Sequence, residues 1–353
     1  MKLQKLGFND SLQEAFQIYK EQGLVPGRIS LEHKRIYRVL TEHGELLGEV
    51  TGKMRHEAEG RGDFPAVGDW VAVQARPEEQ KATIHAILPR FSKFSRKAAG
   101  LITEEQIVAT NVNTVFLVNA LNHDFNIRRL ERYLLMAYES GANPVVILSK
   151  ADLCNDVDEK IRLTESVAFG VPIHAVSVET GAGLDELQPY LGEGQTVALL
   201  GSSGVGKSTL ANYLYGSEVL KTNAVREEDS RGRHTTTHRE LLVMESGGVL
   251  IDTPGMRELQ LWEADEGVGQ SFQDIESIAE QCRFNDCTHN NEPGCAVKEG
   301  LEDGTLDASR YQSYVKLQRE LAFLARKEDQ RLANAERAKW KKIAGDRTRV
   351  HRK

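Results

Sequence analysis

The fold of this chain is decided by one stretch of sequence, Gly201-Ser202-Ser203-Gly204-Val205-Gly206-Lys207-Ser208. It matches the P-loop pattern G-x-x-x-x-G-K-[ST], in which glycines let backbone N–H groups surround phosphate oxygens at the start of a helix. The flanks fit this context, because an apolar strand at 197–200 enters the loop and a helix at 209–214 leaves it. The stretch predicts a nucleotide-binding domain, with Lys207 at the β- and γ-phosphates and Ser208 on Mg²⁺.

Composition and charge argue for a non-membrane protein of several domains. The chain has 353 residues and a formal net charge of -7, and no apolar run reaches the length of a membrane span. After residue 325 there are 11 Lys and Arg residues against 4 Asp and Glu residues, so an acidic body carries a basic tail. This tail, 326–353, could lie along an RNA backbone or be a solvated segment. We expect a cytoplasmic monomer with no membrane partner.

The periodicity of apolar residues changes along the chain and indicates several domains. From 106 to 262, buried strands alternate with helices, which is typical of a doubly wound, largely parallel α/β sheet. Residues 34–105 contain short β-prone runs separated by glycine and proline, which favour a five-stranded oligonucleotide-binding barrel. We expect a short helical extension at 1–33, a helical zinc-binding domain at 263–325, and a basic helix or tail at 326–353.

A guanine-reading tetrad is expected at Ser149-Lys150-Ala151-Asp152, which ends the apolar strand at 145–148. The Asp152 carboxylate can accept hydrogen bonds from both N1–H and the exocyclic amine of guanine, a pair of donors that adenine does not offer. The stem of Lys150 would cover the base, and Ser177 stands where a small loop can donate to guanine O6. Because such a tetrad alone is also typical of surface charge, its weight comes from the P-loop that follows it.

The segment Asp252-Thr253-Pro254-Gly255 ends a second apolar strand. P-loop enzymes place there an acid that holds Mg²⁺ through water, followed by a glycine that senses the γ-phosphate. The polar segment 232–238 is expected to be a switch loop in which Thr236 completes the magnesium shell. The order along the chain is therefore base reader, P-loop, switch I and switch II, which describes a circularly permuted GTPase domain. Such a permutation is tolerated where the original termini lie close together on the surface.

Four potential metal ligands, Cys282, Cys287, His289 and Cys295, follow the pattern C-x4-C-x-H-x5-C. Three thiolates and one imidazole match a closed tetrahedral zinc site, whose role is structural because no position is left for a catalytic water. We expect one Zn²⁺ per chain at these residues. Cys154 stands apart and is expected to be a buried small residue.

Basic residues of the expected barrel could form a nucleic-acid face, with Phe91 and Phe94 as stacking platforms. The alternative is an ordinary solvated rim of a barrel, and the residues alone do not distinguish the two. The basic residues are Arg55, His56, Arg61, Arg90, Lys93, Arg96 and Lys97.

Between residues 34 and 325 the chain resembles the ribosome small-subunit-dependent GTPase family, the circularly permuted GTPases with an N-terminal barrel and a C-terminal zinc domain. The resemblance rests on SKAD, GSSGVGKST, GRHTTTH, DTPG and the Cys/His cluster, in that order. It implies a GTPase that binds the 30S subunit and its 16S rRNA, acts late in maturation of that subunit and is stimulated by it. Ser149 departs from the more usual Asn or Thr, although its hydroxyl can still form a hydrogen bond. The GTP contacts that the resemblance implies are Lys150, Asp152, Ser177, Gly204, Gly206, Lys207, Ser208 and Thr209.

Hydrolysis needs a positioned water, and Met256 stands where Ras-like enzymes carry a water-orienting glutamine. We therefore expect slow intrinsic turnover, with the catalytic groups completed when the RNA partner orders the switch loops. His234 is a candidate water-positioning group, although it could equally well pack on the switch. Two other functions stay open: an ATP-using enzyme or kinase with RNA-binding and zinc modules, and an RNA-binding module whose nucleotide site is structural only.

Overall fold

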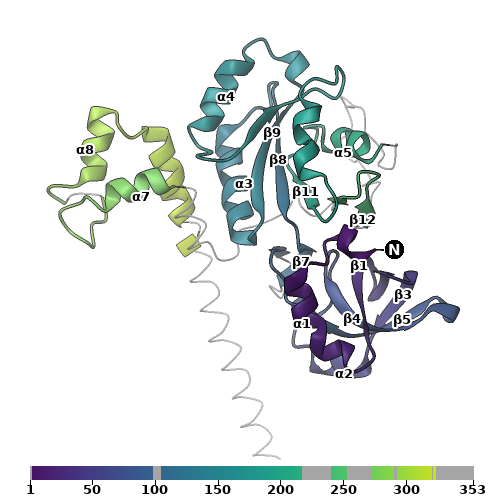
Figure 1. Cartoon of the computed structure of the whole chain (residues 1–353). Coiled ribbons are helices and arrows are strands. Elements are labelled where there is room, and N and C mark those ends of the chain that lie inside the picture. Colours follow the sequence, from purple (N-terminus) through teal and green to yellow (C-terminus); the bar gives the residue numbers. More distant parts are fainter. Residues whose placement is uncertain are drawn as a thin grey trace, which may run out of the picture. The chain divides into compact units, whose positions relative to one another are not determined.

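The computed structural model of the chain describes residues 2–97, 105–216, 240–252, 272–289, 292–319 and 321–322. The chain divides into two compact units, Met1–Gln260 and Leu261–Lys353. In the first unit, eleven of the described strands form one continuous sheet in the order β10-β9-β8-β11-β13-β12-β1-β2-β3-β5-β4 (Figure 1). This sheet combines a barrel with a nucleotide-binding domain, which confirms the predicted combination of folds in that unit.

The barrel closes because β1 pairs with β2 on one side and with β4 on the other. Its interior is apolar and includes Ile29, Val39, Leu46, Val71 and Ile84. The five strands and the closure agree with the oligonucleotide-binding barrel predicted from the sequence. The barrel strands are β1 (Val25–His33), β2 (Ile36–Thr41), β3 (Gly44–Val50), β4 (Trp70–Arg76) and β5 (Lys81–Ile87), with α2 (Gly52–Glu57), η2 (Arg61–Asp63) and η3 (Pro77–Glu79) between them.

The barrel begins earlier in the chain than residue 34, because β1 lies in the segment expected to be a helical extension. Pro26 and Gly27 suggest a break, yet both residues pair with β4. Glycine is needed at position 27 for close packing and not for a turn, since a Cβ atom there would lie 2.5 Å from Cγ1 of Val39 inside the barrel. Two helical elements precede the strand, η1 (Leu3–Leu6) and α1 (Asp10–Lys20).

Arg28 of β1 is buried and connects four separate segments of the first unit. Its guanidinium donates hydrogen bonds to acceptors in the amino-terminal segment, the barrel, the link between domains and the first residue of β11. These acceptors are the carbonyl oxygens of Leu6, Gly68 and Asn111 and the hydroxyl of Thr196. Burial lowers the pKa of Arg28 to about 9, and the nearby Asp69 carboxylate opposes this decrease. Burying this charge therefore costs free energy, and the hydrogen bonds of the guanidinium offset that cost.

The nucleotide-binding part of the sheet is doubly wound. Strands β10, β9, β8, β11 and β13 are parallel, and β12 is antiparallel to β13. Alternate residues of β8 face opposite layers: Leu117 packs in the cluster that contains Leu134 of α3, and Phe116 in the cluster that contains Leu210 of α5. Helices α3 and α4 thus cover one face and α5 the other (Figure 1).

The strands of this domain are β8 (Thr114–Ala120), β9 (Asn143–Ser149), β10 (Ile173–Ala175), β11 (Thr196–Leu200), β12 (Glu240–Val243) and β13 (Val249–Asp252). Its helices are α3 (Ile127–Ser140), η4 (Ala151–Leu153), α4 (Val157–Glu165), η5 (Leu184–Tyr190) and α5 (Lys207–Tyr215). A two-stranded ribbon of β6 (Lys93–Lys97) and β7 (Glu105–Thr110) lies between the barrel and this domain in the sequence.

The regular secondary structure described in the second unit consists of helices, which are joined by turns. It contains α7 (Gln273–Ala279), α8 (Ala296–Asp303) and a further helical stretch at residues 308–319. Arg310 joins the last stretch to α7 through two hydrogen bonds to the Asp274 carboxylate, of 2.6 and 2.7 Å. None of the helices in the described ranges is long and apolar enough to cross a membrane. The basic tail at 326–353 lies outside the described residues.

Replacing Arg28 with methionine is predicted to lower the free energy of unfolding by about 3 kcal/mol or more, because several buried acceptors would lose their donor at about 1–3 kcal/mol each. Urea-induced unfolding of the purified variants measures this change. Arg76→Met is the matched control, since the Arg76 side chain is 41% exposed and a surface substitution changes stability by about 0.5 kcal/mol or less. Equal losses in the two variants would contradict the role given to Arg28.

Candidate functional site

The P-loop joins β11 to α5 at the carboxyl end of the sheet. Gly204 and Gly206 have φ values of 82° and 92°, a left-handed conformation that glycine adopts without steric cost. Gly201 has a different requirement, because a Cβ atom there would lie 2.5 Å from the carbonyl oxygen of Val118 in β8. The glycines of the motif therefore allow both the turn and its close approach to the neighbouring strand.

Lys207, the first residue of α5, is buried and folds back into the loop. Its ammonium donates to the carbonyl oxygen of Gly201 at 2.7 Å and also to that of Ser202. The positive charge thus lies among backbone groups at the start of a helix, where the helix dipole also favours an anion. This arrangement can bind a phosphate group.

The predicted base-reading tetrad is hydrogen-bonded directly to the P-loop. The Ser149 hydroxyl, at the end of β9, donates to the carbonyl oxygen of Val205 at 2.7 Å. The Lys150 ammonium reaches the carbonyl oxygen of Gly204 at 2.8 Å, from a backbone with a φ of 59°. Two segments that are more than fifty residues apart in the sequence are thereby held in one site.

Asp152 and Ser177 meet beside this junction. The buried Ser177 hydroxyl donates to one carboxylate oxygen of the exposed Asp152 at 2.5 Å, and it accepts a hydrogen bond from the backbone N–H of Thr180. The backbone N–H of Ala151 donates to the carbonyl oxygen of Val176, which ties the two loops together. The Ser177 hydroxyl thus holds the Asp152 carboxylate in one orientation.

The structure adds one residue that the sequence analysis missed, Asp124 in the loop after β8. Its carboxylate accepts a hydrogen bond from the Ser202 hydroxyl of the P-loop at 3.0 Å and forms an ion pair with Arg129 at 2.9 Å. Desolvation raises the pKa of Asp124, but hydrogen bonds from Arg129 and Ser202 outweigh it, so the pKa is lowered overall. Its position at the carboxyl end of a parallel strand, where ligands of such sheets bind, was the available signal.

The remaining predicted nucleotide contacts are only partly described. Ser208 and Thr209 lie in the first turn of α5, and Ser203 lies exposed in the loop. Asp252 ends β13, with its backbone paired to Glu240 of β12. His234, Thr236 and Gly255 lie outside the described residues, so their roles stay predictions.

The four predicted metal ligands come together in the second unit. One ligand atom of each of Cys282, Cys287, His289 and Cys295 lies within 4.8 Å of the others. The two buried sulfurs, of Cys282 and Cys295, are 3.9 Å apart, and each lies within 3.6 Å of His289 Nδ1. A tetrahedral Zn–S site with bonds of about 2.3 Å places its sulfurs about 3.8 Å apart. The cluster therefore has the geometry of a metal site, and its donors fit zinc. Cys154 belongs to the first unit and is half-buried, whereas the sequence predicted a buried residue.

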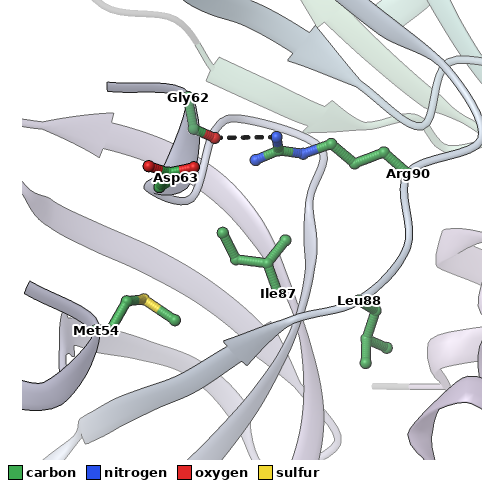
Figure 2. Close-up of a pocket in the computed structure, with 6 residues that line it drawn as sticks. All are labelled: Met54, Gly62, Asp63, Ile87, Leu88 and Arg90. Carbon is green, nitrogen blue, oxygen red and sulfur yellow. Dashed lines mark hydrogen bonds between the residues drawn. The ribbon is translucent and has the colours of Figure 1, made fainter. Parts of the chain in front are cut away.

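Arg90, one of the barrel residues expected to face nucleic acid, is held within the fold instead. Arg90 makes a bidentate ion pair with the buried Asp69 and donates to the carbonyl oxygen of Gly62, as Figure 2 shows for the latter. These contacts fix one wall of a pocket of about 400 Å³ whose lining includes Met54 and Ile87 (Figure 2). Arg90 therefore supports the barrel and is not available as a mobile cation.

Of the two expected stacking residues, Phe91 is 45% exposed, whereas Phe94 is only 2% exposed. Phe94 cannot be a stacking platform, because alternation along β6 turns it into the core. Lys93, which precedes it, forms an ion pair with Glu105 at 2.8 Å. The expected basic face is thus smaller than the sequence suggests.

Comparison with known proteins places this geometry in a family context. The family model described as RsgA GTPase matches residues 87–262. A curated protein of Opitutus terrae, named small ribosomal subunit biogenesis GTPase RsgA, is 48% identical over 99% of this chain and 98% of its own length. A protein of Lactiplantibacillus plantarum named small ribosomal subunit biogenesis GTPase RsgA 2 is 51% identical, covering 90% and 89%.

Two solved structures have the same fold. The crystal structure of YjeQ from Thermotoga maritima aligns with a TM-score of 0.62 and 29% identity, covering 85% of this chain and 99% of that one. The structure of YloQ, described as a circularly permuted GTPase, aligns with a TM-score of 0.61 and 27% identity, covering 85% and 95%. The predicted permuted order of motifs agrees with that description.

Replacing Ser149 with alanine is predicted to weaken binding of both GTP and GDP by about fivefold, since the hydrogen bond to the P-loop carbonyl contributes about 1 kcal/mol. Titration with fluorescent GDP and GTP analogues measures both affinities. Ser149→Thr keeps the hydroxyl and should bind like the unchanged protein, and Ser166→Ala, in an exposed turn after α4, is the control. Unchanged affinity in Ser149→Ala would show that the contact does not shape the site.

Proposed function

The chain belongs to the RsgA GTPase family and is a GTP-hydrolysing enzyme, and we propose that it acts on the small ribosomal subunit during a late stage of its maturation. Curated relatives along nearly its whole length are named for biogenesis of that subunit. The alternative of an ATP-using enzyme or kinase is not favoured by this membership. We infer that the 30S subunit and its 16S rRNA are the partners and that they stimulate hydrolysis.

The observation that carries the proposal is the hydrogen-bonded junction between the base reader and the P-loop. Asp152 is oriented by Ser177, and the same loop is fastened to the P-loop by Ser149 and Lys150. A carboxylate held in this way can accept from N1–H and the exocyclic amine of guanine, and the stem of Lys150 can cover the base. The geometry supports selection of guanine over adenine.

The phosphate end of the site is proposed to work through charge and backbone N–H groups. The loop residues 201–206 would surround the phosphates, with the Lys207 ammonium on the β- and γ-oxygens and Thr209 in contact with the nucleotide. Mg²⁺ supplies neutralisation of the developing charge when bound, and the residues proposed to hold it are Ser208, Thr236 and Asp252. Gly255 would sense the γ-phosphate, and His234 would orient the attacking water, because Met256 cannot.

The other parts of the chain are proposed to bind the RNA partner. The Cys/His cluster would hold one structural Zn²⁺, since all four protein ligands are present and no position is left for a catalytic water. Barrel and zinc domain would contact rRNA, with the barrel beginning at β1 and further domain limits near residues 106, 263 and 326. We further infer that the protein acts in the cytoplasm, because the ribosomal subunits with which it would act are assembled in that compartment, and that it is a monomer.

Multiple-turnover GTP hydrolysis with and without purified 30S subunits tests the function. We expect slow hydrolysis alone and stimulation by about 10² or more with subunits, the range that a correctly positioned water-activating group contributes. Lys207→Ala should abolish both activities by removing charge stabilisation, whereas Lys20→Ala, an exposed lysine of α1, should not. Equal rates with and without 30S subunits would contradict the proposed partner, and retained activity of Lys207→Ala would contradict the P-loop assignment.

Metal analysis tests the proposed zinc site. The purified protein should contain about one zinc per chain, because Cys₃His sites bind this metal as four-coordinate structural centres. Cys295→Ser should lose the metal and the helical structure of the second unit, since binding and folding of such sites are coupled. Cys154→Ser is the control and should keep the metal. Iron in place of zinc, or full metal content in Cys295→Ser, would overturn the assignment.

A further inference from the structure

Glu240 lies at the boundary between the nucleotide-binding sheet and the barrel and contacts both. It is the first residue of β12 and follows the predicted switch segment, 232–238, by two residues. In the ladder it pairs with Asp252 of β13 on one side and with Leu31 of β1 on the other. Since neighbouring strands are about 4.8 Å apart, the barrel backbone lies about 10 Å from that of the predicted magnesium-binding aspartate.

The same row of residues continues into the barrel, where Leu31 pairs with Arg38 of β2. Residues of one row point to the same face of a sheet, so the long side chains of Glu240 and Arg38 can meet over Leu31. They do so, with Arg38 Nη1 at 3.1 Å from Glu240 Oε1. Arg38 Nε also lies 3.7 Å from Glu45 Oε1, which places the guanidinium between two carboxylates.

A local irregularity of β1 makes this contact possible. The register of β1 against β2 shifts between Ile29 and Leu31. Before the shift, the edge of β1 that faces away from β2 pairs with β4 and closes the barrel, and after it the same edge pairs with β12. A bulge bends the strand in which it occurs, and here the bend lets β1 of the barrel pair with β12 at the edge of the GTPase sheet.

The ion pair between Arg38 and Glu240 contributes little to the stability of the fold, but it can hold Glu240 in position. Both side chains are about half exposed, and pairs of this kind contribute little to folding stability. The pair instead fixes the position of Glu240, the first residue of β12. At Glu240, a side chain of the barrel contacts the strand that pairs with β13.

We propose that Arg38 is a positioning residue for the GTP site. Through Glu240 it holds β12 against β13 and so sets the backbone position of Asp252 relative to the P-loop. Because the guanidinium is exposed between carboxylates, an RNA phosphate that approaches the barrel here competes with Glu240 for it. RNA on the barrel thereby changes the GTP site through one ion pair. This inference rests on the proposed function and adds the residue through which the barrel acts.

A charge-exchange cycle in the full chain tests the positioning role without ribosomes. The variants are Arg38→Glu, Glu240→Arg and the double exchange, and the measurement is the affinity for a non-hydrolysable GTP analogue and for GDP with Mg²⁺. Each single variant should lower the ratio of GTP to GDP affinity by about threefold or more, and the double exchange should restore it to within about twofold. A merely structural role would lower thermal stability and leave this ratio unchanged.

Lys53→Glu is the matched control, because it makes the same charge change on the barrel at a residue whose ion pair, with Glu57, lies within α2. Its affinity ratio should stay unchanged. If the effects of the two single exchanges simply multiply in the double variant, the positioning role is wrong. If the unchanged protein is not stimulated by 30S subunits, the proposed function fails and the RNA step with it, whereas the ribosome-free cycle still decides the role of Arg38.

Discussion

The buried guanidinium of Arg28 is the constraint on which the arrangement of the first unit depends. A charge removed from water is tolerated only when its donors are satisfied, and Arg28 meets this condition with acceptors from four segments. One of them, Thr196, begins the strand that leads into the P-loop. Barrel and nucleotide-binding domain are therefore joined at a point where separation would expose unsatisfied groups, and the amino-terminal segment is held at the same point through Leu6.

The continuous sheet extends this connection toward the nucleotide. Arg28 acts at the amino end of β11, while the pairing of β1 with β12 reaches the edge strand beside β13. Among the described contacts between the barrel and the GTPase domain, one therefore lies far from the P-loop and another next to the strand that ends in Asp252. A circular permutation leaves the order of the parallel strands in space intact, so the base reader and the P-loop meet although the reader comes first in the chain.

Much of the fold and the site could be predicted because the relevant signals are local. The P-loop glycines, the tetrad at 149–152 and the Cys/His spacing each describe a short segment whose chemistry needs those residues. Other features depend on contacts that sequence spacing does not reveal. Pro26 and Gly27 suggest a break but lie in β1, since Gly27 faces Val39 inside the barrel. Phe94 is buried by the alternation of β6, and Asp124 reaches Ser202 only because β8 and β11 are neighbours.

The sequence by itself determined the class of fold, the permuted order of motifs, the two segments that meet at the P-loop and the Cys/His cluster with the donors of a metal site. These follow from periodicity and from residue types at fixed spacing, which act over a few residues. Only the tertiary structure decided that Arg28 links the domains, that Arg90 is committed to Asp69, and that Arg38 of the barrel meets Glu240 at the edge of the GTPase sheet. Each of these contacts joins residues that are far apart in the chain. They depend on strand register and burial, which a local sequence pattern does not reveal.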